Sequence, residues 1–273
     1  MNKKLFIKNR IINWSHIITF LCISYALFWI PFILTKVTVS KGNNYWNAVL
    51  GILGPYSPLL AAVIIRSLIS KEGYKDAHLG IRKIAWRYWL LAILLPFFWN
   101  GVQDILHLIF GYSAINPDEI TGGLYRIPIN LFGGFFIFIG EEFGWRSYLV
   151  EKLRPLGRWK VFLISGGFWS LWHMPFLIFA DGGNNFYFTL IGILVTLFIY
   201  VLLGFIFGWL YLESKSVWPC VLMHSYNNLI TMKLLNWEVK TEPALMQNSL
   251  MAAIPILIVW LVLYHKGEFK GVA

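Results

Sequence analysis

Residues 186 to 212 read FYFTLIGILVTLFIYVLLGFIFGWLYL and contain no charged side chain. About 20 apolar residues suffice to cross the hydrocarbon core of a bilayer as an α-helix, so this run predicts a membrane span. Seven further apolar runs lie at about 11 to 35, 47 to 69, 86 to 110, 128 to 149, 160 to 180, 216 to 235 and 248 to 265. The run at 216 to 235 is the weakest, because polar residues interrupt it. We expect an all-α polytopic integral membrane bundle of about eight transmembrane helices, forming a single domain over residues 1 to 273.

The composition agrees with a membrane protein and excludes a nucleic-acid-binding one. The chain is 58% hydrophobic and only 13% charged, and its mean hydropathy is +0.63. A net charge of +10 would suggest nucleic acid in a soluble protein. Here the basic residues fall between the apolar runs, where they orient helices in a bilayer. The expected partner is therefore the lipid bilayer.

The distribution of basic residues predicts the orientation of the chain in the membrane. With eight spans and the N-terminus inside, eighteen of the 23 Lys and Arg residues fall on the inner side and five on the outer side. Because cytoplasmic loops carry an excess of Lys and Arg, both termini are expected in the cytoplasm. Loops rich in Asn and Lys, with abundant Ile, favour an AT-rich bacterial source. We expect a multi-pass protein of the cell membrane.

Two adjacent acids, Glu141 and Glu142, lie in the apolar run at 128 to 149. A charge at mid-membrane costs roughly 2.5 to 3.5 kcal/mol, so such carboxylates usually face a protein-lined cavity. With about 1.5 Å of rise per residue, the pair is expected roughly 10 to 12 Å from the inner end of its span. His224 and His173 are expected in the same slab, in or near the inner half of the membrane.

Helical spacing separates the roles of these residues. Glu142 and Arg146 are four residues apart, the order and distance of a Glu to Arg ion pair, whereas Glu141 is turned about 100° away. His224 and Asn228 share one helix face in the same way. The structural alternatives are an ion pair that locks a helix end and histidines that only bridge helices. Glu141 has no basic partner one turn away, so we expect it to be free for chemistry.

A glutamate, two histidines and an amide form a hydrolytic set without a Ser or Cys nucleophile. A carboxylate beside a histidine can take a proton from water, and a second histidine with an amide can stabilise an oxyanion. Two His and one Glu are also a recognised catalytic zinc shell, so a divalent metal such as zinc stays open as a cofactor, with Glu141, His173 and His224 as candidate ligands. No HExxH motif is present to support it.

Three motifs resemble those of the CPBP intramembrane proteases, also called the CAAX protease and bacteriocin-processing or Abi family. The family patterns are EExxxR, FxxxH and HxxxN/D. This chain has them at Glu141-Glu142-Phe143-Gly144-Trp145-Arg146, Trp169-Ser170-Leu171-Trp172-His173 and His224-Ser225-Tyr226-Asn227-Asn228. Trp169 stands where the family usually has Phe. The resemblance covers roughly residues 128 to 235, the expected catalytic core.

The resemblance implies a site and an activity. Glu141 and His173 would activate the attacking water, His224 and Asn228 would form the oxyanion site, and Glu142 with Arg146 would support them. The implied activity is an intramembrane endopeptidase, a CAAX prenyl protease-like hydrolase or metallopeptidase, whose cavity opens to the cytoplasm. Its substrates would be membrane-associated proteins or peptides, in CAAX-type processing, bacteriocin or signal peptide maturation, or immunity.

Two other classes of function stay open. A non-catalytic immunity or regulatory scaffold would use the same fold to bind a partner in the membrane. A proton-coupled transporter would also place acids and histidines in membrane helices, but the chain has no internal repeat to support it.

Overall fold

The computed structural model describes residues 12–39, 45–81, 84–111, 117–180, 186–231 and 244–271. Several basic residues of the orientation count, those at positions 3, 4, 8, 10, 41, 82, 83, 233 and 240, lie outside these ranges. Within them the chain is helical and contains no strand. The predicted all-α class is therefore confirmed.

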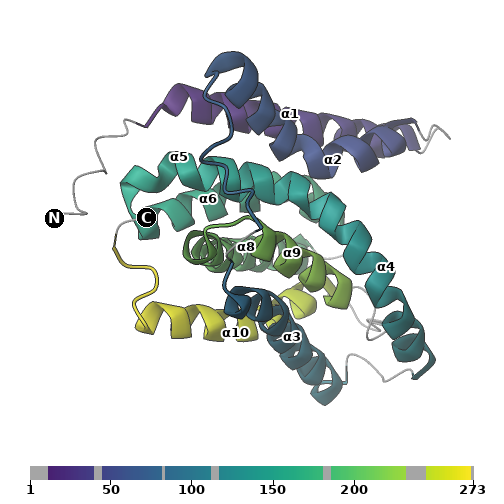
Figure 1. Ribbon diagram of the computed structural model, residues 1–273. Helices are drawn as coiled ribbons and strands as arrows, with labels where there is room; N and C mark the ends of the chain where they lie inside the picture. The colour runs from purple at the N-terminus through teal and green to yellow at the C-terminus, as the bar shows by residue number, and fades with distance from the viewer. Residues whose placement is uncertain are drawn as a thin grey trace.

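Most of the chain is in long helices, which Figure 1 shows running between the same two ends of the molecule. These are α1 (Trp14–Val39), α2 (Tyr45–Ile64), α3 (Trp86–Ile109), α4 (Pro117–Glu142), α6 (Arg158–Trp172), α8 (Phe186–Ser214), α9 (Trp218–Thr231) and α10 (Ala244–His265). Short elements extend or join them: the π-helices η1 (Ile65–Ile69) and η2 (Phe143–Val150), α5 (Glu151–Leu153), the 3-10 helix η3 (Arg154–Leu156) and α7 (Met174–Ala180).

Seven of the eight expected spans are helices long and apolar enough to cross a membrane in the described part of the chain. The run expected at 216 to 235 differs from them. Its described helix, α9, has only 14 residues, because polar side chains interrupt its apolar pattern and residues 232–243 lie outside the description. The chain is a polytopic membrane bundle, and the described part of α9 is too short to count among these seven helices.

The fourth span is longer than its hydropathy predicts. A helix continues from Ile127 through η2 to Leu156, whereas the apolar run ends near residue 149. Glu141 therefore lies close to the middle of this helix, roughly 20 Å from either end, while its depth in a membrane stays a prediction. The additional length comes from α5 and η3, which follow η2 and contain the charged residues Glu151, Lys152 and Arg154.

Neighbouring helices form a nearly closed circuit around the interior. α1 packs on α2, α2 on α4, α4 on α9, α9 on α3, α3 on α10, α10 on α8 and α8 on α6, while α7 returns to α1. In Figure 1, α1 and α2 cross the top, α3 and α10 the bottom, and α8 and α9 lie between them. Helices far apart in the sequence, such as α4 and α9, thus meet side by side.

Two glycines, one in α4 and one in η2, allow α2 to approach the fourth span closely. A Cβ added at Gly140 would lie 2.5 Å from the carbonyl oxygen of Pro55, and one at Gly144 would overlap Pro58. Tyr56 closes the contact, because its hydroxyl donates a 2.9 Å hydrogen bond to the carbonyl of Phe136. Lipid gives helices no hydrophobic reason to associate, so such backbone proximity supplies much of their attraction.

Large aromatic side chains fill the interior of the molecule, and large apolar side chains also cover its outer surface. Trp99, Trp145 and Trp172 are among its largest fully buried side chains. Ile18, Ile52, Leu94, Ile105, Leu194 and Ile258 are among many large apolar side chains on the outer helix faces. A surface of this kind is expected where lipid replaces water around helices whose backbone groups are satisfied internally.

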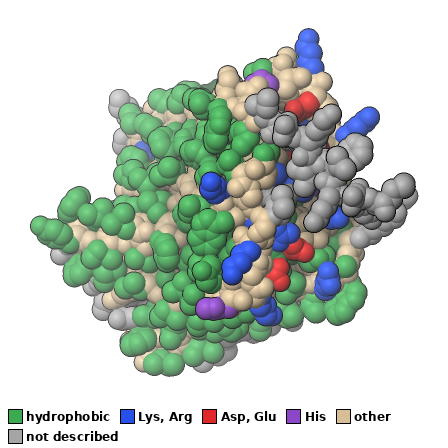
Figure 2. Space-filling view, turned by 90° about the vertical axis from the view of Figure 1, so that its left-hand side faces the viewer, with side chains coloured by type: hydrophobic (Ala, Val, Ile, Leu, Met, Phe, Trp, Pro, Cys, Tyr) green, Lys and Arg blue, Asp and Glu red, His purple; other side chains and the backbone are tan. Residues whose placement is uncertain are grey.

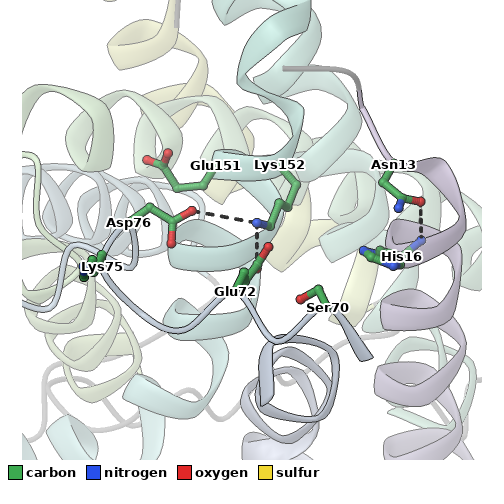
Figure 3. Close-up of a pocket in the computed structure, with 8 residues that line it drawn as sticks. All are labelled: Asn13, His16, Ser70, Glu72, Lys75, Asp76, Glu151 and Lys152. Atoms are coloured by element: carbon green, nitrogen blue, oxygen red, sulfur yellow. Dashed lines mark hydrogen bonds and ion pairs between the residues drawn. The ribbon is translucent and has the colours of Figure 1, made fainter. Parts of the chain in front are cut away.

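One end of the bundle carries most of the described charge, and we call it the charged end. It contains Arg66, Lys75, Lys152, Arg158, Lys215 and Lys270 together with Glu72, Asp76, Glu151 and Glu213. Figure 2 looks onto this end and shows basic and acidic side chains gathered beside apolar surface. In Figure 3, Lys152 reaches Glu72 and Asp76, 2.7 and 3.8 Å away.

The segment 70–81 crosses the charged end and ties three parts of the bundle together. Ser147 of η2 donates its hydroxyl to the carbonyl of Ala77. Past the end of α8, the amide of Val217 bonds to His78 and the indole of Trp218 bonds to Leu79, at 3.1 and 2.8 Å. The segment thus holds η2 and the start of α9 in a fixed relation.

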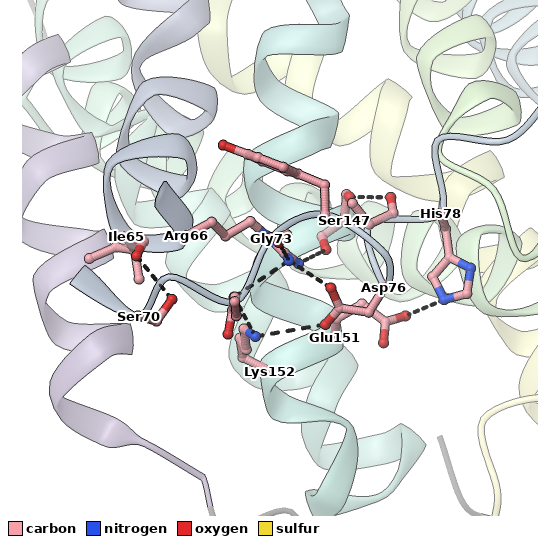
Figure 4. A network of polar contacts seen from close by, with 12 residues as sticks. Ile65, Arg66, Ser70, Gly73, Asp76, His78, Ser147, Glu151 and Lys152 are labelled. Carbon is pink, nitrogen blue, oxygen red and sulfur yellow. Dashed lines mark hydrogen bonds and ion pairs between the residues drawn. The ribbon is translucent and has the colours of Figure 1, made fainter. Parts of the chain in front are cut away.

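Arg66 is the centre of this network and is fully buried. Figure 4 shows its guanidinium bonded to Asp76 at 2.6 Å, to the carbonyl of Gly73 at 2.8 Å and to that of Ser147 at 3.2 Å. Burial acts to raise the pKa of Asp76, but the hydrogen bond and charge of Arg66, with the charge of Lys152, outweigh it and hold that pKa below its ordinary value.

We expect Gly140→Ala to destabilise the protein by about 1 to 3 kcal/mol, because the new methyl group meets the backbone of α2 and overpacks the interface. Gly133→Ala on the same helix is the matched control, since a Cβ there meets nothing within 4 Å. Thermal unfolding in detergent measures both variants. Equal melting temperatures for the two would contradict a close contact between α2 and α4.

We expect Asp76→Asn to cost about 1 kcal/mol at pH 7, because Arg66 keeps its other partners. Since the folded pKa of Asp76 is lowered, its stabilisation is present above the unfolded value near 3.9 and is lost as the pH falls through the folded value. The melting temperatures of wild type and variant should therefore converge below about pH 4. Lys75→Gln, an exposed neighbour, is the control; a gap that stays constant with pH would refute the assignment.

Candidate active site

A cavity of about 540 Å³ lies inside the bundle. Seven elements line it, mostly with apolar side chains: Phe28 of α1, Asn47, Leu50, Gly51, Gly54 and Pro55 of α2, Ile137, Phe138 and Glu141 of α4, Trp172 at the end of α6 with His173 after it, Phe176 of α7, Tyr200 of α8, and His224 and Asn228 of α9. The polar groups gather at its inner part, where Glu141, His173 and His224 are less than a tenth exposed. The four site residues expected from the sequence thus share one cavity.

Behind the cavity, the second acid of the pair joins two helices. Glu142 is fully buried, with one carboxylate oxygen 2.8 Å from Nδ1 of His224 and the other 3.2 Å from Nε of Arg146. The predicted pair of Glu142 and Arg146 is confirmed. The contact with His224 escaped the sequence analysis, because helical spacing reveals partners on one helix only.

Trp169 links the two acids to the rest of the site. Its indole N–H donates a 3.2 Å hydrogen bond to Oε2 of Glu141. The guanidinium of Arg146 lies 4.4 Å from the centre of the same ring, and the ring of His224 meets it edge-on at 5.8 Å. A Phe at this position would keep the ring contacts but could not donate the hydrogen bond.

The hydrogen bond of His173 fixes which of its ring nitrogens is available. Nδ1 lies 2.8 Å from the carbonyl oxygen of Trp169. A carbonyl only accepts, so Nδ1 carries the hydrogen and the neutral ring keeps its lone pair on Nε2. The ring also packs on Tyr200, with centroids 4.4 Å apart, which limits its rotation.

A chain of donors and acceptors orients the amide of Asn228. The indole of Trp99 donates to Oδ1 of Asn227 at 2.7 Å, and Nδ2 of Asn227 donates to Oδ1 of Asn228 at 3.0 Å. Because an indole N–H can only donate, it determines which end of the Asn227 amide faces Asn228. Because Oδ1 of Asn228 accepts this hydrogen bond, its Nδ2 group is the one available to donate to a ligand in the cavity. No sequence motif pointed to Trp99, whose partner Asn227 lies on another helix.

The structure also bears on the metal alternative. Within the described ranges, no three or more His, Cys, Asp and Glu side chains group closely enough to hold a metal ion. Glu141, His173 and His224, the candidate ligands, line one cavity but do not form such a group. We therefore derive no step through a metal.

Comparison with known proteins identifies the segment that contains the site. Residues 123–230 match the family described as type II CAAX prenyl endopeptidase Rce1-like. This segment contains Glu141, His173, His224 and Asn228, the four residues that meet in the cavity. Over this segment, which is less than half of the chain, the sequence is similar to the Rce1-like family. The family resemblance seen in the three motifs is thus confirmed.

One protein similar to this chain is CAAX prenyl protease 2 of Methanococcus maripaludis. It is 32% identical over 136 residues, which are 46% of this chain and 48% of the relative. The chain therefore spans about half the length of the relative that it matches.

Proposed function

We propose that this protein is an intramembrane endopeptidase that hydrolyses peptide bonds of membrane-associated proteins or peptides. The observation that carries the proposal is the single cavity in which Glu141, His173, His224 and Asn228 meet. The match of residues 123–230 to the Rce1-like family supports it. CAAX-type processing, as in the name of the relative, and maturation of bacteriocin or signal peptides are the substrate classes that fit.

Glu141 and His173 are the groups proposed to activate water. Nε2 of His173 can accept one hydrogen bond from a water molecule, and the Glu141 carboxylate can accept the other. The hydrogen bond from Trp169 holds Oε2 of Glu141 at 3.2 Å, so Oε1 is the oxygen proposed to take the proton. A positioned base of this kind contributes typically 10²- to 10⁴-fold to the rate.

His224 and Asn228 are the groups proposed to stabilise the oxyanion. Nδ1 of His224 is used in the hydrogen bond to Glu142, so a second hydrogen bond to the oxyanion must come from Nε2. The imidazolium form carries a hydrogen on both nitrogens and can donate both bonds. Asn228 donates through Nδ2, the end of its amide that Asn227 does not use. Each such donor is worth roughly 3 to 4 kcal/mol in known cases.

The reaction then proceeds in two steps. The water oxygen bonds to the carbonyl carbon while Glu141 takes its proton, and the carbonyl oxygen becomes the oxyanion beside His224 and Asn228. The C–N bond next breaks, and Glu141 returns the proton to the departing amine. Glu141, Glu142, Arg146 and protonated His224 sum to zero charge, and the negative charge that leaves Glu141 appears on the oxyanion. The buried site therefore keeps its net charge throughout.

We expect Glu141→Gln to reduce cleavage at least about 100-fold with the melting temperature nearly unchanged, because the amide cannot take a proton. Membrane-peptide proteomics of cells with wild type or variant identifies the precursors that accumulate, and the reconstituted proteins are then assayed on those peptides. Glu213→Gln, at the charged end, is the matched control. Wild-type cleavage by Glu141→Gln would refute the mechanism. Full biological complementation by the Glu141→Ala/His173→Ala double variant would instead support the scaffold alternative.

We expect Trp169→Phe to reduce kcat by roughly 10-fold with KM unchanged, because it removes one hydrogen bond to the Glu141 carboxylate and keeps the ring. Trp169→Ala should cost far more, since Arg146 also loses the ring beneath its guanidinium. Steady-state assays in liposomes separate kcat from KM. A rise in KM alone would contradict this role, because it would mean that Trp169 contacts the substrate and does not hold Glu141 in place.

A further inference from the structure

The cavity extends from the site in one direction only, away from the charged end. Along α2 its lining begins near Pro55 and continues back to Asn47, a distance of about 12 Å. α2 runs the other way, from Pro55 towards Arg66, to reach the charged end. On α4 the lining likewise takes Ile137 and Phe138, which precede Glu141, and nothing from η2 beyond it.

Exposure increases along the same direction. Glu141 and His224 are 6% and 4% exposed, whereas Ile137 and Phe176 are 43% and 45% exposed. Asn47 and Gly51, near the start of α2, are exposed as well. These four outer residues, Asn47, Gly51, Ile137 and Phe176, mark the mouth of the cavity.

Between the site and the charged end the bundle is closed. The residues there, which we call the closing layer, are Phe20 of α1, Ala61, Ile65 and Arg66 of α2 and η1, and Trp145, Ser147, Tyr148 and Leu149 of η2, and each is at most 2% exposed. Phe20 packs on Trp145 and Tyr148 with ring centroids 5.5 and 4.9 Å apart. The segment 70–81 covers the layer through Arg66 and Ser147.

The mouth and the basic residues therefore lie at opposite ends. Within the described ranges, eleven Lys and Arg residues besides the buried Arg146 lie in segments at or next to the charged end, whereas Lys36 and Arg126 lie towards the opposite end. Together with the sequence count of 18 inner to 5 outer residues, the positive-inside rule assigns the charged end to the cytoplasm. Two expectations from the sequence, a cytoplasmic basic end and a cavity open to the cytoplasm, cannot both hold for this fold. The 18 to 5 asymmetry is the stronger of the two, because it counts the whole chain.

We propose that the cavity opens to the outer half of the membrane and that its substrates reach Glu141 from that side. This inference rests on the proposed endopeptidase function. The outward opening defines the substrate class as membrane-associated peptides or precursor segments that have already been inserted or exported. Peptides held at the cytoplasmic leaflet would meet the closing layer instead.

Cysteine labelling tests the proposal without any use of catalysis. The background carries Cys22→Ala, because Cys22 is exposed, and keeps Cys220, which is buried. Gly51→Cys places a thiol at the mouth, where a Cβ meets nothing within 4 Å. Lys270→Cys places one at the charged end. Each is treated with a membrane-impermeant maleimide in intact cells and again after permeabilisation, with and without Glu141→Gln.

The expected result is that Gly51→Cys is labelled in intact cells and Lys270→Cys only after permeabilisation, whether or not Glu141 is present. The reverse pattern overturns the proposal, because it places the mouth in the cytoplasm. Failure to label Gly51→Cys under both conditions overturns it as well, because the mouth is then closed to water. Loss of cleavage in labelled Gly51→Cys would add support, while absence of cleavage in every variant would count against the proposed function alone.

Discussion

The arrangement of the site depends on one fully buried carboxylate. Glu142 has no access to solvent, so its charge is tolerable only if partners surround it, and Arg146 and His224 are those partners. Arg146 belongs to η2 and His224 to α9, so the same carboxylate fixes the distance between two helices of different spans. Glu141 on α4 and Asn228 on α9 meet in one cavity for this reason. Without these two partners the buried charge of Glu142 would be unpaired, and nothing at this point would hold the polar residues of α4 and α9 towards each other.

The network at the charged end supports that arrangement from one end of the bundle. Arg66 bonds to Asp76 and to the carbonyl of Ser147, so the segment after η1 is attached to the helix that follows Glu142. The indole of Trp218, at the start of α9, bonds to the same segment. The two helices that Glu142 joins inside the bundle are therefore also joined at its end, which limits their sliding past each other.

The sequence predicts the spans and the pairs within a helix, and much less of what happens between helices. Hydropathy locates seven spans, because apolar content over about 20 residues is a local property. The pair of Glu142 and Arg146 follows from helical spacing for the same reason. The bond from Glu142 to His224 and the chain from Trp99 to Asn228 depend on how α4, α3 and α9 pack, which no local pattern contains. The length of the fourth helix was also not predictable from hydropathy, because α5 and η3 continue it through residues that are not apolar.

The position of Glu141 near the middle of its span constrains the shape of anything that reaches it. A transmembrane helix hides its carbonyl carbons behind its own hydrogen bonds, and breaking those bonds in lipid leaves polar groups without partners. Asn47, Tyr200 and Asn228, which line the cavity, can supply some of those partners to an extended strand. Segments containing Gly or Pro unwind at lower cost than Leu-rich ones. Local helix instability, rather than a particular sequence of side chains, is thus the first property that this site would select.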